Sequence, residues 1–197
     1  MTRFFKTVTF LPEDRNNEVL VGRCIHILHG VCMNNEINDI GLSFPNWCIE
    51  TVGERISFIS KDKRNLEFLL NQQYFFQMER LGYFNISETH PVNTQPEDDV
   101  LFIRNQAIDN SFPGALRRDI KRAERRAFER GEEYTATYAP THYEQEHYHT
   151  IAVSSGSKRT NFRLNIQMVK PNAPIDGEFT SYGLSNKSDT QCSVPVI

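Results

Sequence analysis

The 197-residue sequence lacks several features that would place it in a common class of protein. It contains no run of about eighteen apolar residues, so no segment is a candidate membrane span. Its first fifteen residues carry charges on both sides of a short apolar run, a pattern that does not fit a signal peptide. The four cysteines show neither a CxxC pair nor zinc-ligand spacing, so we expect reduced thiols in a cytoplasmic protein.

Motifs of the common nucleotide-binding and hydrolase families are also missing. We find no glycine-rich phosphate loop, no nucleophile elbow and no internal repeat. Three histidines, His142, His147 and His149, lie close to two glutamates, but their spacing fits no metalloprotease or zinc-finger pattern. We therefore favour a polar loop over a metal site and expect no cofactor.

The sequence does contain a strong local concentration of positive charge. The chain as a whole has a net charge of −3, yet the segment 113–130 holds seven basic and only three acidic side chains. The basic residues are Arg117, Arg118, Lys121, Arg122, Arg125, Arg126 and Arg130. Clustered guanidinium groups in an otherwise acidic protein are typical of a surface that binds a phosphate backbone.

The same segment has the features of a helix. Pro113 suits a first turn, where a missing N–H is no loss, and Gly131 suits the position just after the last turn. Apolar residues recur at helical spacing on one face, while the arginines line another. These apolar residues are Leu116, Ile120, Ala123 and Ala127. A solvated helix whose arginines pair with its own acids is the alternative, but three acids are too few for seven bases.

The N-terminal half predicts an α+β fold with a ferredoxin-like domain over residues 1–95. Strand patterns cover 4–10, 40–44, 55–60 and 83–86, and helix patterns cover 17–33 and 64–72, the second continuing to 80 in a longer version. The order β-α-β-β-α-β is that of a split ferredoxin-like unit. The polar stretch 88–99 has the composition of a linker.

Residues 96–197 are predicted to form a smaller α+β domain that carries the arginine-rich helix. Strands are expected over 100–108, 148–153, 162–169 and 178–184, with a polar loop over 131–146. The loop between the second and third of these strands holds Ser154, Ser155 and Ser157 beside Lys158 and Arg159. A serine there could hydrogen-bond a ribose hydroxyl or a phosphate, although composition alone favours an ordinary hairpin turn.

His29 is the candidate for proton transfer. It lies near the C-terminal end of the first predicted helix, where the helix macrodipole favours the protonated imidazole and would poise it for proton exchange near neutral pH. A surface or capping histidine is the alternative, and His26 competes for any role on the same helix.

Several motifs follow one another in a specific order over nearly the whole chain. They are His29, the segment 40–45 (IGLSFP), Arg104 with Gln106 on a strand, the arginine-rich helix, Ser155 seven residues before 162–164 (FRL), and 181–185 (SYGLS). In this order and spacing the chain resembles the subtype I-F CRISPR repeat endoribonuclease family. Segments 7–13, 43–48 and 77–84 are most similar to the versions carried by CRISPR-bearing transposons, which use the complex to guide DNA insertion.

The resemblance implies that the C-terminal domain grips a repeat hairpin in the CRISPR transcript. The arginine helix would dock in the groove of the stem, Arg104 and Gln106 would hydrogen-bond base edges near its foot, and Phe162 would stack at the stem base. The implied RNA-binding residues are Arg104, Gln106, Arg117, Arg118, Lys121, Arg122, Arg125, Arg126, Ser157, Lys158, Arg159 and Phe162.

A metal-free reaction is also implied by the resemblance. The ribose 2′-hydroxyl upstream of the scissile phosphate would attack that phosphate, leaving a 2′,3′-cyclic phosphate and a 5′-hydroxyl, so DNA cannot react. His29 matches the proton-transfer residue, Ser155 the serine that holds the nucleophilic hydroxyl, and Tyr182 the tyrosine that orients the histidine.

Two positions depart from the family pattern. If Leu116 and Ile120 keep the apolar register, Asp119 falls where the family carries a groove-reaching arginine, whereas a shift of one residue gives Arg118 and Arg122 the family's i, i+4 pair. The serine loop also carries Gly156 between its serines.

We therefore expect an endoribonuclease that cleaves CRISPR precursor RNA at the foot of the repeat hairpin and stays bound to the guide. Its expected partners are the repeat hairpin, the backbone and other subunits of the type I-F surveillance complex, and, from the transposon resemblance, an adaptor protein of the transposition machinery. A non-catalytic hairpin-binding subunit is the main alternative, and a generic ferredoxin-like RNA binder is a third.

Overall fold

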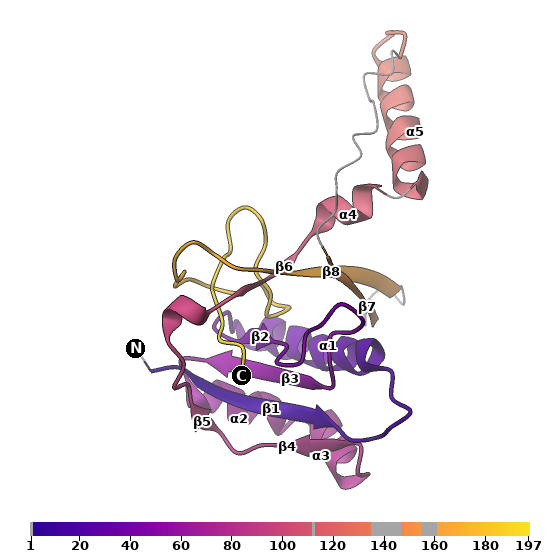
Figure 1. Cartoon of the computed structure of the whole chain (residues 1–197). Helices are drawn as coiled ribbons and strands as arrows, with labels where there is room; N and C mark the ends of the chain where they lie inside the picture. Colours follow the sequence, from indigo (N-terminus) through magenta and orange to yellow (C-terminus); the bar gives the residue numbers. More distant parts are fainter. Residues whose placement is uncertain (1, 112, 135–146, 155–160) are drawn as a thin grey trace.

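The computed structural model describes residues 2–111, 113–134, 147–154 and 161–197 (Figure 1). Within these ranges the chain forms two antiparallel sheets, and the helix α5 (Pro113–Glu129) stands apart from both of them. Two of the predicted catalytic residues, His29 and Tyr182, lie where helix α1 (Asn17–Asn35) meets the C-terminal segment.

The first sheet contains four main strands in the order β2-β3-β1-β4, with every neighbouring pair antiparallel. These strands are β1 (Phe4–Phe10), β2 (Gly41–Ser43), β3 (Arg55–Ser60) and β4 (Phe84–Ile86). The connecting helices are α1 (Asn17–Asn35), α2 (Lys63–Leu70) and α3 (Gln73–Arg80). This is the strand order of a split ferredoxin-like unit, so the predicted α+β fold is confirmed. The short strand β5 (His90–Pro91) and a 3₁₀ turn (Pro96–Asp98) occupy the predicted linker.

Helix α1 positions His29. It is capped at its start by Asn16, whose side chain accepts a hydrogen bond from the Val19 N–H, and at its end by Glu36 in the left-handed conformation. The predicted apolar stripe is buried, and it consists of Val21, Cys24, Ile25, Leu28 and Cys32. His29 follows Leu28 on the flank of this stripe and is half-buried. Burial raises the pKa of the Cys32 thiol to about 12, which suits an unreactive core cysteine.

The second sheet has the order β6-β8-β7, again antiparallel. Its strands are β6 (Leu101–Arg104), β7 (His149–Ser154) and β8 (Asn161–Val169). Helix α1 packs closely on β7, because Gly22 leaves room for the Ala152 carbonyl oxygen, which would lie only 2.2 Å from a Cβ at that position. The first helix of one sheet therefore covers a strand of the other.

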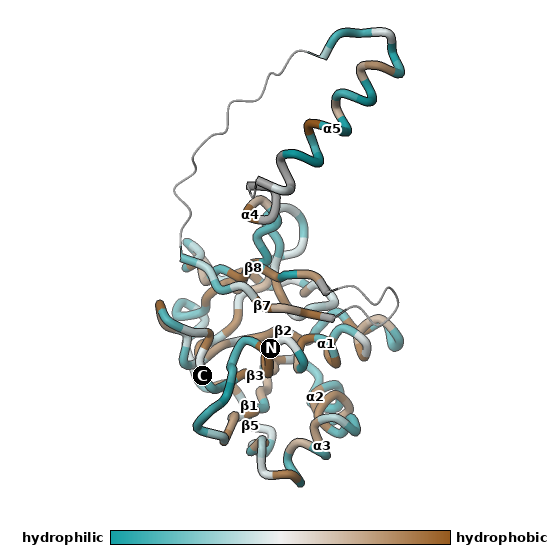
Figure 2. The backbone as a smooth tube through the Cα atoms, turned by 90° about the vertical axis from the view of Figure 1, so that its right-hand side faces the viewer, coloured by the Kyte–Doolittle hydropathy of each residue, from teal (hydrophilic) through white to brown (hydrophobic). Residues whose placement is uncertain are grey.

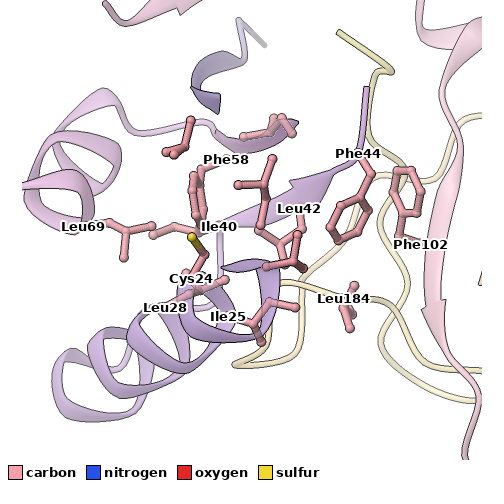
Figure 3. Close-up of a cluster of buried hydrophobic side chains, with 14 of the residues drawn as sticks. Cys24, Ile25, Leu28, Ile40, Leu42, Phe44, Phe58, Leu69, Phe102 and Leu184 are labelled. Carbon is pink, nitrogen blue, oxygen red and sulfur yellow. The ribbon is translucent and has the colours of Figure 1, made fainter. Parts of the chain in front are cut away.

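One buried apolar cluster extends across both sheets (Figure 3). Phe44, at the end of β2, meets Phe102 of β6 edge to face with 4.9 Å between ring centroids, and Leu184 of the C-terminal segment lies beside them. A fully buried Phe contributes about 1.5–3 kcal/mol, so these rings fasten the two sheets to each other. The predicted domain boundary between residues 95 and 96 stays a prediction.

Two predicted element boundaries were wrong. The second helix does not run unbroken to residue 80, because Gln72 is extended (φ −62°, ψ 146°) and separates α2 from α3. The strand predicted over 100–108 ends at Arg104, since the buried Asn105 accepts a hydrogen bond from the Ala107 N–H and caps helix α4 (Gln106–Ser111). Gln106 therefore begins a helix instead of lying on a strand.

The segment predicted as a strand over 178–184 is instead a tight turn. The Thr180 N–H donates to the Leu184 carbonyl at 3.0 Å, the Gly183 N–H donates to Thr180 at 2.8 Å, and Gly183 has φ +70°. The turn is anchored on one side by the Leu42 N–H, which donates to Gly183. On its other side Ser185 exchanges backbone hydrogen bonds with β6. The two sheets thus hold the turn between them.

Helix α5 extends into solvent, away from the two sheets (Figures 1 and 2). Its end is the predicted glycine cap: Gly131 has φ +71°, its N–H donates to Phe128, and the Glu132 N–H donates to Ala127. Of the apolar face predicted for the helix, Ala127 is buried but Ile120 is 40% exposed. The described part of α5 is therefore stabilised mainly by its own hydrogen bonds and caps.

Candidate functional site

His29 lies against the C-terminal turn, although the two are far apart in the sequence. Its Nδ1 is 2.9 Å from the Ser181 Oγ, and its imidazole stacks on the Tyr182 ring with 4.2 Å between centroids and 10° between planes. Because Ser181 engages Nδ1, proton exchange with a substrate falls to Nε2. The hydrogen bond and the stacking together fix both the position and the plane of the imidazole.

Two further predicted residues surround Tyr182. The Phe162 ring meets it edge to face at 5.8 Å, and the Arg104 guanidinium carbon lies 5.4 Å from the Tyr182 centroid and 5.9 Å from the Phe162 centroid. These distances are within the range of cation–π contacts. Helix α1, strands β6 and β8, and the C-terminal turn therefore bring four of the predicted site residues together.

Arg104 has unused hydrogen-bonding capacity in this cluster. Its Nε is buried and reaches no acceptor within the described part of the chain. A buried donor without a partner costs about 1–3 kcal/mol, and native structures contain few of them. A phosphate oxygen or a base edge brought by a ligand would satisfy it, which is the kind of contact that arginine makes with nucleic acids.

The environment of His29 favours the neutral imidazole. Burial lowers its pKa below the ordinary value of 6.5, the nearby His26 lowers it further, and a hydrogen bond with the Ser181 backbone opposes both effects. The sequence-based expectation that the helix C-terminus would favour protonation was wrong. Helix α1 continues to Asn35, and the macrodipole acts only within the last turn. At neutral pH His29 can therefore accept a proton.

A cleft of about 420 Å³ adjoins the His29 cluster. One wall is formed by the end of β6 and the start of α4, including Arg104 and the exposed Gln106. The other wall is the C-terminal segment, with Ser181, Tyr182 and Lys187. Its volume falls within the range of small-molecule sites, so a nucleotide-sized group fits against Ser181 and Tyr182, the two residues that contact the imidazole.

The predicted RNA-binding residues of α5 are all exposed: Arg117, Arg118, Lys121, Arg122, Arg125 and Arg126. Only two of them form ion pairs within the described ranges, Arg122 with Asp119 and Arg125 with Glu129, each at 3.5 Å. Exposed pairs of this kind contribute at most about 1 kcal/mol. The helix consequently presents an excess of positive charge, and pairing with its own acids does not neutralise it.

Four of the predicted site residues, Ser155, Ser157, Lys158 and Arg159, lie outside the described residues, as does His142. The other two histidines of that group are near each other, with 3.1 Å between the Nε2 atoms of His147 and His149. His149 Nε2 is also 2.8 Å from the Cys48 carbonyl oxygen. Across the described ranges no group of three or more histidine, cysteine or acidic side chains is arranged to hold a metal ion.

Ser181 is the residue that sequence reasoning missed. It immediately precedes Tyr182 in the motif at 181–185, and its hydroxyl lies 2.9 Å from His29 Nδ1. A polar residue beside the expected orienting tyrosine was the available signal. Nothing in the sequence alone indicates which of the two neighbours contacts the imidazole.

Comparisons with curated proteins and solved structures gave only a distant structural similarity. A search among proteins with curated descriptions found no match. One solved structure, described as "An RAMP protein binding different RNA substrates", aligns with 98% of this chain and 100% of its own at 11% identity and a TM-score of 0.34. None of the described helices has the length and apolar content needed to cross a bilayer.

A family match covers nearly the entire sequence. Residues 5–196 match the family described as "CRISPR-associated protein (Cas_Csy4)". The matched range includes every residue of the His29 cluster, the cleft and the arginine-rich helix. The chain therefore belongs to the Cas_Csy4 family, the type I-F endoribonucleases that process CRISPR repeats.

Proposed function

We propose that this protein is a metal-independent endoribonuclease that cleaves CRISPR precursor RNA at the foot of the repeat hairpin. The family match supports hairpin binding and processing in general. The observation that carries the finer proposal is the His29 cluster, where a largely neutral imidazole is fixed by Ser181 and Tyr182 beside a cleft and an arginine with an unpaired donor.

The imidazole supplies the proton transfer that the reaction needs. His29 Nε2 accepts the proton of the ribose 2′-hydroxyl while the 2′ oxygen forms a bond to the adjacent phosphorus. The bond from phosphorus to the 5′ oxygen breaks, that oxygen takes up one proton from water, and the imidazolium returns its proton to the solvent. The products are a 2′,3′-cyclic phosphate and a 5′-hydroxyl, with no net change in protons. General base catalysis of this kind contributes about 10²–10⁴-fold.

The remaining residues position the RNA. Arg104 and Gln106 face the cleft and would contact bases at the foot of the stem, Phe162 would stack beneath the last pair, and Ser155 would hold the nucleophilic hydroxyl. The exposed cations of α5 would bind the phosphates of the stem. Slow release of the cleaved hairpin then keeps the protein on the guide within a type I-F surveillance complex. The transposon resemblance adds a transposition adaptor as a further proposed partner.

A cleavage assay with EDTA tests the enzymatic proposal. The substrate is labelled RNA of the repeat that neighbours this gene, and the expected product ends just 3′ of the stem. His29→Ala should lower the single-turnover rate at least 100-fold and leave the hairpin affinity within about threefold, because His29 supplies no charge to binding at neutral pH. His26→Ala, on the same helix, is the matched control and should retain cleavage.

Each outcome of this assay is decisive. Tight binding of intact RNA by the unmodified protein would establish the alternative, a non-catalytic hairpin-binding subunit. Equal affinity for the repeat hairpin and for a scrambled stem of the same length would instead indicate a generic RNA binder. Cleavage by His29→Ala at the unmodified rate would refute the mechanism.

A further inference from the structure

Phe128 is an apolar side chain that the fold does not use. It lies in the last turn of α5 and is 85% exposed, more than any other large hydrophobic residue in the described ranges. Its neighbour Ala127 is 4% exposed, so the same turn does bury an apolar group, but on another side of the helix. The exposed ring therefore contributes little to the stability of α5.

The ring lies on the basic face of the helix. Eleven residues separate Phe128 from Arg117, which is close to three full turns at 3.6 residues per turn, so the two side chains are nearly in line. Lys121 and Arg125 lie within a quarter turn of the same line, as does the acidic Glu124, and all four charged side chains are exposed, so three cations outnumber one anion around the ring. A lone aromatic ring on a mainly cationic stripe suits a partner that offers both negative charge and flat apolar surfaces.

The position of Phe128 along the helix indicates which part of an RNA hairpin it would meet. Helix α5 follows α4, whose first residue, Gln106, lines the cleft beside Tyr182. Helix α5 has 17 residues and, at 1.5 Å per residue, spans about 25 Å. Figure 1 shows that it is directed away from the sheets. If the foot of the stem lies at the cleft, as the proposed function requires, Phe128 lies toward the closed end of the hairpin.

We propose that Phe128 stacks on an unpaired base in the apical loop of the RNA hairpin. Bases in a loop can be unstacked and accommodated on an aromatic side chain, whereas paired bases in the stem cannot. Such stacking depends little on base identity. The flanking cations favour a polyanion over an apolar protein groove, because they would lose hydration in such a groove without gaining a partner. The inference rests on the proposed function and adds a second point of contact, remote from the cleavage site.

The test compares two variants on two hairpins. Stacking of one base contributes about 1–3 kcal/mol, so Phe128→Ala should raise the Kd for the repeat hairpin about tenfold, and Phe128→Trp should restore it. On a hairpin whose loop residues are abasic, Phe128→Ala and the unmodified protein should bind equally. Ile120→Ala is the matched control: Ile120 is also an apolar side chain of α5 and is 40% exposed, but it lies eight residues, or about 12 Å along the helix, before Phe128, and its loss should leave the Kd within twofold.

A spectroscopic measurement locates the contact. With 2-aminopurine at each loop position in turn, the unmodified protein should quench one position and Phe128→Ala should not. The cleavage rate at saturating protein should be unchanged in Phe128→Ala, because the ring is far from His29. If the unmodified protein neither binds nor cleaves the hairpin, the proposed function itself fails. If it does both and Phe128→Ala binds the natural loop equally well, only this inference is overturned, and the ring is left for a protein partner.

Discussion

Gly183 carries the sharpest prediction about how the fold supports the site. It has φ +70°, and a Cβ at this position would lie 2.7 Å from both Leu28 Cδ2 and Leu42 Cγ. The left-handed conformation costs an L-residue about 1–2 kcal/mol, and overpacking costs a further 1–3 kcal/mol. Gly183→Ala should therefore lower the free energy of unfolding by about 2–5 kcal/mol, a large fraction of the 5–15 kcal/mol typical of a domain.

The same substitution should also damage catalysis. Ser181 and Tyr182 belong to the turn that Gly183 closes, so relief of the clash moves the groups that hold His29. Misplacement of a reacting group by about 1 Å can cost 100-fold in rate, and we expect a fall of about 10- to 100-fold in single-turnover cleavage under conditions where the variant is folded.

Gly82→Ala provides the matched control. Gly82 has φ +75°, but no heavy atom lies within 4 Å of a Cβ built there, so the variant isolates the conformational cost of about 1–2 kcal/mol. Urea unfolding gives the free energy of unfolding of each variant, and the difference between their losses of stability is the contribution of packing at Gly183. Equal destabilisation by the two substitutions, or unimpaired cleavage by Gly183→Ala, would show that close packing at Gly183 does not fix the position of His29.

Two further predictions concern His29. Ser181→Ala should lower the cleavage rate about tenfold with little change in hairpin affinity, whereas Ser181→Thr, which keeps the hydroxyl, should recover most of it; equal rates for both variants would exclude a positioning role. Because burial and His26 hold the pKa of His29 below 6.5, the base form predominates at neutral pH, so kcat/KM should be level there and fall as the pH drops through a midpoint below 6.5. Since His26 lowers the His29 pKa, His26→Ala should move that midpoint upward, and a midpoint above 6.5 in the unmodified protein would contradict this account.

Local patterns predicted most of the fold. The apolar spacing of helix α1 specifies which of its side chains are buried, and strands were predicted at β1 and β3; the structure confirms these elements. The glycine after α5 was also predicted correctly, because a left-handed cap is a local property of the backbone. The ferredoxin-like strand order followed from the sequence of these elements alone.

The failures occurred where tertiary contacts decide the local conformation. Asn105 starts a helix because its side chain is buried against Gln167 and caps the next turn, whereas the neighbouring apolar residues look like a continuous strand. The C-terminal segment is a turn because it hydrogen-bonds to β2 and β6 at once. The contact between His29 and Ser181 joins residues 152 positions apart, and no spacing rule could have paired them. For the same reason the sequence led us to expect a raised pKa for His29, whereas burial against the C-terminal turn lowers it.

The separation of α5 from the sheets has a consequence for how such a protein can change over time. Substitutions on the exposed face of α5 disturb almost no core packing, so the RNA-binding surface can diverge while the protein stays folded. The turn at 180–185 has no such freedom, because it is hydrogen-bonded to β2 on one side and to β6 on the other. If the proposed function holds, selection for a new repeat is expected to change α5 and to spare the turn, and replacing α5 with that of a relative is a direct way to change the RNA that is bound.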